Sequence, residues 1–152
     1  MILDDKLMKY VLFKKRTKNE VREKCKALNY EESYIEEVLE YLEENEYIND
    51  ALYVQKYIAN VMRIKKASVN EMKMDLLRRG IDSHLIEQCL EDSLNEFELQ
   101  SAIQIVQKKA KTMEIEKLKR YLLNKGYSYD NIAKAIDNLQ EIDDNGNEGG
   151  EA

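Results

Sequence analysis

Apolar residues recur at helical spacing along most of the chain, and they are interrupted by start and stop signals rather than by turns typical of β-sheets. The clearest segment is Ser68 to Ile81. Ser68 and Glu71 form a capping box, in which the hydroxyl and the carboxylate each accept an amide proton at the start of a helix. Gly80 supplies the left-handed residue that ends such a helix, and Ile81 is the apolar residue that follows it. The pattern predicts one capped helix here.

The same layout occurs twice more. Thr17 and Glu20 begin a helix that Asn29 and Tyr30 end, and Gly126 and Tyr127 repeat the ending, although Glu114 stands where a hydroxyl would be expected. The apolar positions of the three helices also align, as Val21, Met72 and Leu118, then Cys25, Leu76 and Leu122. We interpret the chain as three copies of one unit.

Amphipathic segments surround each capped helix. We expect helices over 5–15, 17–28 and 31–44, then 50–65, 68–80 and 83–94, and finally 96–111, 114–125 and 129–139. The predicted fold class is all-α, with repeats at 1–49, 50–95 and 96–140 and a disordered acidic tail at 141–152. Units this small bury their faces against neighbours, so we expect an elongated, curved, solenoid-like body.

Composition supports this fold class, because the chain contains no proline and only five glycines in 152 residues. Apolar residues make up 43% of it and charged residues 36%. The net charge is −6, but the charges lie in blocks: residues 14–30 hold seven bases and two acids, whereas residues 31–50 hold nine acids and no base. This segregation leaves room for basic binding surfaces on an acidic protein.

Catalytic and metal chemistry finds no support in the residues. His84 is the only histidine, and we expect it on the surface. Cys25 and Cys89 lie at apolar helical positions without CxxC spacing, which favours buried thiols over metal or redox sites. We expect no cofactor, no metal and no catalytic residue. The absence of a signal peptide and of roughly twenty consecutive apolar residues predicts a cytoplasmic protein without a membrane span.

Binding is the remaining class of function. Basic residues collect before each capped helix and at the end of the second one. We expect these clusters to form a stripe that could follow a phosphate backbone or an acidic protein groove. The candidate contact residues are Arg16, Lys18, Arg63, Lys65, Lys66, Arg78 and Arg79.

Several motifs in the chain follow one another in a fixed order. Asn49, Asp50 and Tyr53 come first, then the basic run Arg63 to Lys66, and then Arg78-Arg79-Gly80-Ile81. This order resembles the RecX family, and Arg16-Thr17 with Glu20-Val21 resembles that family's Arg-Ser/Thr-x-x-Glu-Leu start. It covers about residues 7–140. The resemblance implies a fold of tandem three-helix repeats and a non-enzymatic regulator that binds RecA or RecA–DNA filaments and restrains recombination.

Two alternatives stay open at this point: a helical-repeat adaptor for another protein, and an autonomous single-stranded DNA-binding protein whose tyrosine rings stack on bases. Under the RecA interpretation we expect a monomer with at most weak DNA contact of its own.

Overall fold

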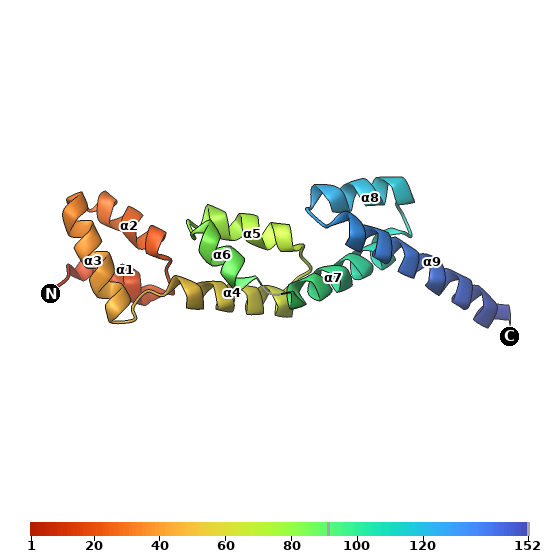
Figure 1. Ribbon diagram of the computed structural model, residues 1–152, viewed down its shortest axis with the longest axis horizontal. Coiled ribbons are helices and arrows are strands. Elements are labelled where there is room, and N and C mark those ends of the chain that lie inside the picture. Colours follow the sequence, from red (N-terminus) through yellow and green to blue (C-terminus); the bar gives the residue numbers. More distant parts are fainter. Residues whose placement is uncertain (91, 152) are drawn as a thin grey trace. The chain divides into compact units, whose positions relative to one another are not determined.

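The computed structural model describes residues 1–90 and 92–141, and its described residues contain helices and no β-strand. The predicted all-α class is therefore confirmed. Nine helices follow one another along the chain (Figure 1): α1 (Asp5–Phe13), α2 (Lys18–Ala27), α3 (Glu32–Glu44), α4 (Asp50–Ile64), α5 (Val69–Arg78), α6 (Ser83–Cys89), α7 (Ser93–Lys109), α8 (Ile115–Asn124) and α9 (Tyr129–Glu151). Taken in threes, they are consistent with the predicted repeats.

The predicted helix signals are confirmed at the residues named. The Thr17 hydroxyl accepts the Glu20 amide at 3.0 Å, and Ser68 forms the full reciprocal box with Glu71. The stops lie in the left-handed region, with φ of 63° at Asn29, 81° at Gly80 and 91° at Gly126. At each stop the next residue donates its amide to a carbonyl five residues back, the pattern of a Schellman motif.

The boundary between α6 and α7 differs from the prediction. α6 ends at Cys89 rather than at residue 94, and α7 begins at Ser93 rather than at residue 96. The inner face of α7 includes Leu94 but also the buried polar residues Glu98 and Ser101. These polar residues interrupt the apolar periodicity, which is why the sequence pattern predicted too late a start for α7.

The end of α9 also lies beyond the predicted residue 139. Residues 142–152 are outside the described residues, so the predicted disordered tail at 141–152 stays a prediction.

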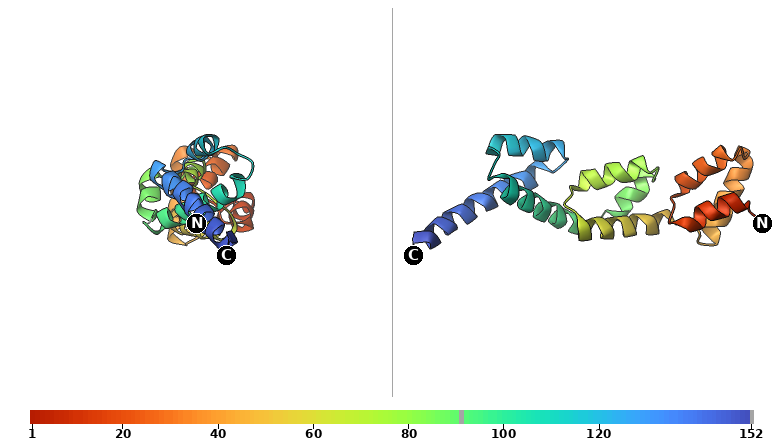
Figure 2. Two further views of the ribbon diagram at one scale, coloured as in Figure 1. Left: turned by 90° about the vertical axis from the view of Figure 1, so that its right-hand side faces the viewer. Right: turned by 180° about the vertical axis from the view of Figure 1, so that it is seen from behind.

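Close contacts divide the chain into two compact units. Unit 1 comprises Met1–Ile58 and Asp75–Cys89, and unit 2 comprises Ala59–Met74 and Leu90–Ala152. The core of unit 1 gathers side chains of α1, α2 and α3 together with Ile48. The core of unit 2 gathers side chains of α7, α8 and α9 with Tyr127, and these helices lie side by side in Figures 1 and 2. The predicted domain boundaries and the elongated, curved shape stay predictions.

Unit 1 is held by a set of contacts that we call joint 1, between the start of α2 and the second repeat. The Thr17 hydroxyl, which caps α2, also donates to the Arg79 carbonyl at 3.1 Å. The Lys18 amide donates to an Asp50 carboxylate oxygen at 2.9 Å. Asn19 packs against Gly80, where a Cβ atom would lie only 2.4 Å from the Asn19 Cβ.

Unit 2 contains the equivalent joint 2, one repeat further on. The Ser68 hydroxyl donates to the Lys125 carbonyl at 2.7 Å. The Val69 amide donates to a Glu98 carboxylate oxygen at 2.9 Å. Asn70 packs against Gly126, where a Cβ would lie 2.9 Å from the Asn70 Cβ.

The joints explain why the units do not coincide with the repeats. Each joint satisfies polar groups at one helix start and one helix end that their own helices leave without partners. Each joint connects part of the predicted middle repeat to a neighbouring one. The predicted middle repeat, residues 50–95, is accordingly divided between the two units.

Candidate interaction surface

The segment of residues 62–66, which we call the α4 end, presents apolar and basic side chains together. Met62 is 44% exposed and Ile64 is 62% exposed, and Arg63, Lys65 and Lys66 are exposed beside them. The helix ends here, so the unpaired carbonyls of its last turn favour positive charge at this place. The α4 end can accordingly contact an acidic surface that also offers apolar side chains.

The end of α1 has the same composition in unit 1. Leu12 and Phe13 are 65% and 81% exposed, and the exposed Lys14 and Lys15 follow them. Phe13-Lys14-Lys15 and Ile64-Lys65-Lys66 occupy equivalent positions, two to four residues before the cap hydroxyls of Thr17 and Ser68. The sequence interpretation considered only the bases and missed the exposed apolar residue before each pair.

Arg16 and Lys18 already have partners within unit 1. The Arg16 guanidinium lies 3.8 Å from the centre of the Tyr10 ring, and its Nε donates to the Tyr10 carbonyl at 3.0 Å. Its side chain is only 11% exposed. Lys18 forms an ion pair with Glu43 at 2.6 Å. These two residues orient α1, α2 and α3 as well as contributing positive charge.

Arg79 lies in a polar cluster between α4 and α5 of unit 1. Its guanidinium donates hydrogen bonds to the Tyr53 hydroxyl at 2.8 Å and to the Asp75 carboxylate at 3.2 Å. It also lies 4.8 Å from the centre of the Tyr57 ring. Burial alone would lower the pKa of Arg79, but the Tyr53 hydroxyl and the Asp75 charge outweigh it and raise the pKa. Arg79 is therefore charged and held in place, whereas its neighbour Arg78 is exposed.

The predicted contact residues thus fall into two groups. Arg16, Lys18 and Arg79 are engaged inside unit 1, and Arg78 is exposed on the same unit. The exposed Arg63, Lys65 and Lys66 belong to unit 2, where Arg63 donates to Asn60 at 2.7 Å. A single stripe across both groups stays a prediction.

The histidine, cysteine and acidic side chains of the described residues form no cluster suited to metal binding. Among them, no three His, Cys, Asp or Glu side chains gather closely enough to hold a metal ion. His84 is exposed, as predicted, and its ring contacts Gln88 one turn along α6. Cys25 is fully buried in the core of unit 1, where burial raises the pKa of its thiol, and Cys89 is half-buried.

No helix in the described part of the chain has both the length and the apolar character needed to cross a bilayer. A hollow of about 30 Å³ lies beside Arg16 in unit 1, lined in part by Tyr47, Leu52 and Tyr53. A larger groove lies on unit 2 and is described below.

Comparison with known proteins identifies relatives in sequence and in structure. No family model matches the chain. It is 32% identical over 137 residues to the regulatory protein RecX of Clostridium beijerinckii, covering 84% of this chain and 63% of the relative. It is 33% identical over 122 residues to the regulatory protein RecX of Caldanaerobacter subterraneus, covering 79% and 61%. The chain thus spans about three-fifths of the length of these curated relatives.

Solved structures agree. The crystal structure of RecX from Lactobacillus salivarius superposes with a TM-score of 0.80 at 26% identity, over 91% of this chain and 94% of that one. A second crystal structure of a regulatory protein RecX gives a TM-score of 0.78 at 19% identity and supports the fold. By sequence and by structure, this chain belongs to the RecX family.

Proposed function

We propose that this protein is a non-enzymatic regulator that binds the RecA recombinase, or its filament on DNA, and restrains ATP hydrolysis and strand exchange. Membership of the RecX family, whose relatives are named regulatory proteins, supports this role. The observation that carries the proposed mode of binding is the α4 end, where exposed Met62 and Ile64 alternate with exposed bases.

The mixture of side chains favours contact with protein as the main source of affinity. A surface that binds nucleic acid alone derives its affinity from lysine and arginine, and that affinity falls steeply with salt. Exposed apolar side chains between the bases add a contribution that salt does not screen. The net charge of −6 further weakens autonomous binding to a polyanion. Contact with single-stranded DNA is accordingly weak or made only within the filament.

The test is RecA's hydrolysis of ATP on single-stranded DNA, with this protein titrated in at substoichiometric amounts. We expect the rate to fall. Charge reversal of Arg63, Lys65 and Lys66 to Glu should raise the protein concentration needed for half-maximal inhibition at least tenfold. A matched variant reverses three exposed lysines elsewhere, Lys6, Lys9 and Lys117, and should inhibit like the unmodified chain.

An unchanged rate at excess protein would refute regulation of RecA and favour the adaptor. Equal loss of inhibition in both variants would show that net charge, and not the α4 end, carries the interaction. Salt-dependent binding to single-stranded DNA without RecA would favour the autonomous DNA-binding protein.

A further inference from the structure

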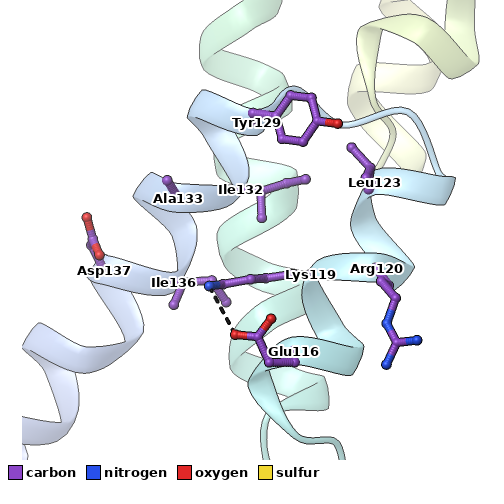
Figure 3. Close-up of a pocket in the computed structure, with 9 residues that line it drawn as sticks. All are labelled: Glu116, Lys119, Arg120, Leu123, Tyr129, Ile132, Ala133, Ile136 and Asp137. Atoms are coloured by element: carbon purple, nitrogen blue, oxygen red, sulfur yellow. Dashed lines mark hydrogen bonds and ion pairs between the residues drawn. The ribbon is translucent and has the colours of Figure 1, made fainter.

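A groove of about 550 Å³ lies between α8 and α9 on unit 2 (Figure 3). Ile132 and Ile136 form its apolar floor, and Leu123 and Tyr129 flank one end. Lys119 extends from α8 across the space towards α9, and Arg120 lies on the α8 rim. Two carboxylates also line the groove, Glu116 on α8 and Asp137 on α9. Tyr129 is 77% exposed and Leu123 is 39% exposed, so this end of the groove leaves much apolar surface in water.

The first repeat contains the equivalent helix pair, α2 and α3, but there an ion pair covers the corresponding apolar surface. Ile35 and Leu39 of α3 correspond to Ile132 and Ile136, and both pairs are buried. Above them, Arg22 of α2 forms an ion pair with Glu36 of α3, which bridges the two helices. In the first repeat, a basic side chain from one helix and a carboxylate from the other thus cover the apolar floor.

In the third repeat this bridge is missing one partner. Lys119 stands at the position of Arg22, but Ala133 stands at the position of Glu36. Lys119 turns instead to Glu116 on its own helix, at 3.5 Å, and keeps 44% of its side chain exposed. Exposed pairs of this kind contribute little to stability. A carboxylate supplied from outside therefore competes easily for Lys119.

The shape of the groove suits a helix. Its α8 wall runs from Glu116 to Leu123, which is about 10 Å or two helical turns. Grooves between two helices bind the apolar face of an amphipathic helix through side chains spaced three or four residues apart. Two such apolar side chains would cover Ile132 and Ile136, and a carboxylate one turn away would reach Lys119 and Arg120.

We propose that this groove binds an acidic amphipathic helix of the recombinase, which supplies the carboxylate that Ala133 lacks. The inference rests on the proposed function, since it assigns RecA as the partner. It adds a second contact surface on unit 2, independent of the α4 end, with apolar side chains and one charge pair as its source of specificity.

The decisive variant is Ala133→Glu, which gives the third repeat the residue found in the first. Position 133 is exposed on α9, and the first repeat accommodates the same charge pair, so the variant is expected to fold. Glu at 133 would pair with Lys119 and cover the floor. The matched control, Ala27→Glu, makes the same change at an exposed position of α2 that lies outside both the groove and the α4 end.

The measurement is the affinity of fluorescently labelled protein for RecA filaments on single-stranded DNA, with circular dichroism confirming equal helix content. We expect Ala133→Glu to bind at least tenfold more weakly, Lys119→Glu to behave likewise, and Ala27→Glu to bind like the unmodified chain. If the unmodified chain itself does not bind, the proposed function fails.

If the unmodified chain binds and Ala133→Glu binds equally well, only the groove assignment is overturned. Equal weakening by Ala27→Glu would also overturn it, because the effect would then reflect charge alone. The unmodified chain could also sediment as a dimer, and Ala133→Glu could dissociate that dimer. This result would overturn the assignment, because the occupant of the groove would then be a second copy of the chain.

Discussion

Removal of the Ser68 hydroxyl should destabilise unit 2 far more than removal of an ordinary helix cap. The side chain is fully buried and makes two hydrogen bonds in opposite directions. It accepts the Glu71 amide at 2.9 Å, and it donates to the Lys125 carbonyl at 2.7 Å, 57 residues away. Ser68→Ala removes both.

The expected loss is the sum of two effects. Replacement of a capping serine by alanine costs about 1 kcal/mol. The Lys125 carbonyl also loses its partner in a part-buried hydrogen bond, which costs roughly 1–3 kcal/mol more. The free energy of unfolding should therefore fall by about 2–4 kcal/mol. With a urea dependence of about 2 kcal/mol per molar for a chain of this size, the unfolding midpoint should fall by about 1–2 M.

Ser128 provides the matched control. It caps α9 by accepting the Asn131 amide at 3.1 Å, but it is exposed. Ser128→Ala should cost about 1 kcal/mol. Urea unfolding of both variants, followed by far-ultraviolet circular dichroism, measures the difference. Equal losses in the two variants would refute the claim that the hydroxyl connects successive repeats.

Three further predictions concern the joints and the thiols. Gly80→Ala should lower the free energy of unfolding by about 2 kcal/mol or more in urea titrations, because φ is 81° and the new Cβ would lie 2.4 Å from the Asn19 Cβ; a variant as stable as the unmodified chain would contradict the close approach. Glu98→Gln should cost about 3 kcal/mol, because the carboxylate is 3% exposed and accepts hydrogen bonds from Val69, Ser128 and Asn131; a thermal midpoint unchanged by the substitution would refute this role. Burial raises the pKa of the Cys25 thiol, so a thiol reagent at neutral pH should modify Cys89 readily and Cys25 only on unfolding; rapid modification of two thiols in the folded protein would contradict the buried position.

Local signals predicted most of the fold. The hydroxyl, carboxylate and glycine positions each act within a few residues, so Thr17, Ser68, Gly80 and Gly126 could be assigned from the sequence alone. Asn29 was assigned in the same way, although a side chain at positive φ is uncommon. The helix boundary after Cys89 was wrong because buried polar residues of α7 imitate an exposed face.

The long-range contacts could not be predicted in this way. Nothing near Thr17 indicates that its hydroxyl donates to a carbonyl 62 residues away. Likewise, a lysine or arginine in the sequence does not reveal whether it is exposed like Lys65 or packed on a ring like Arg16. One signal was present in hindsight: asparagine stands two residues after both cap hydroxyls, at Asn19 and Asn70, and each packs against the glycine of the next repeat.

The two joints also bear on how such a protein can change in length during evolution. Each joint takes its donors from one repeat and its acceptors from the next, and the two joints use equivalent positions. A deletion of one full period, residues 20–70, would bring Thr17 opposite Lys125 and Asn19 opposite Gly126, and so would restore a matching pair. Gene rearrangements in whole periods therefore preserve complementary surfaces, whereas those that remove part of a period leave buried groups unmatched.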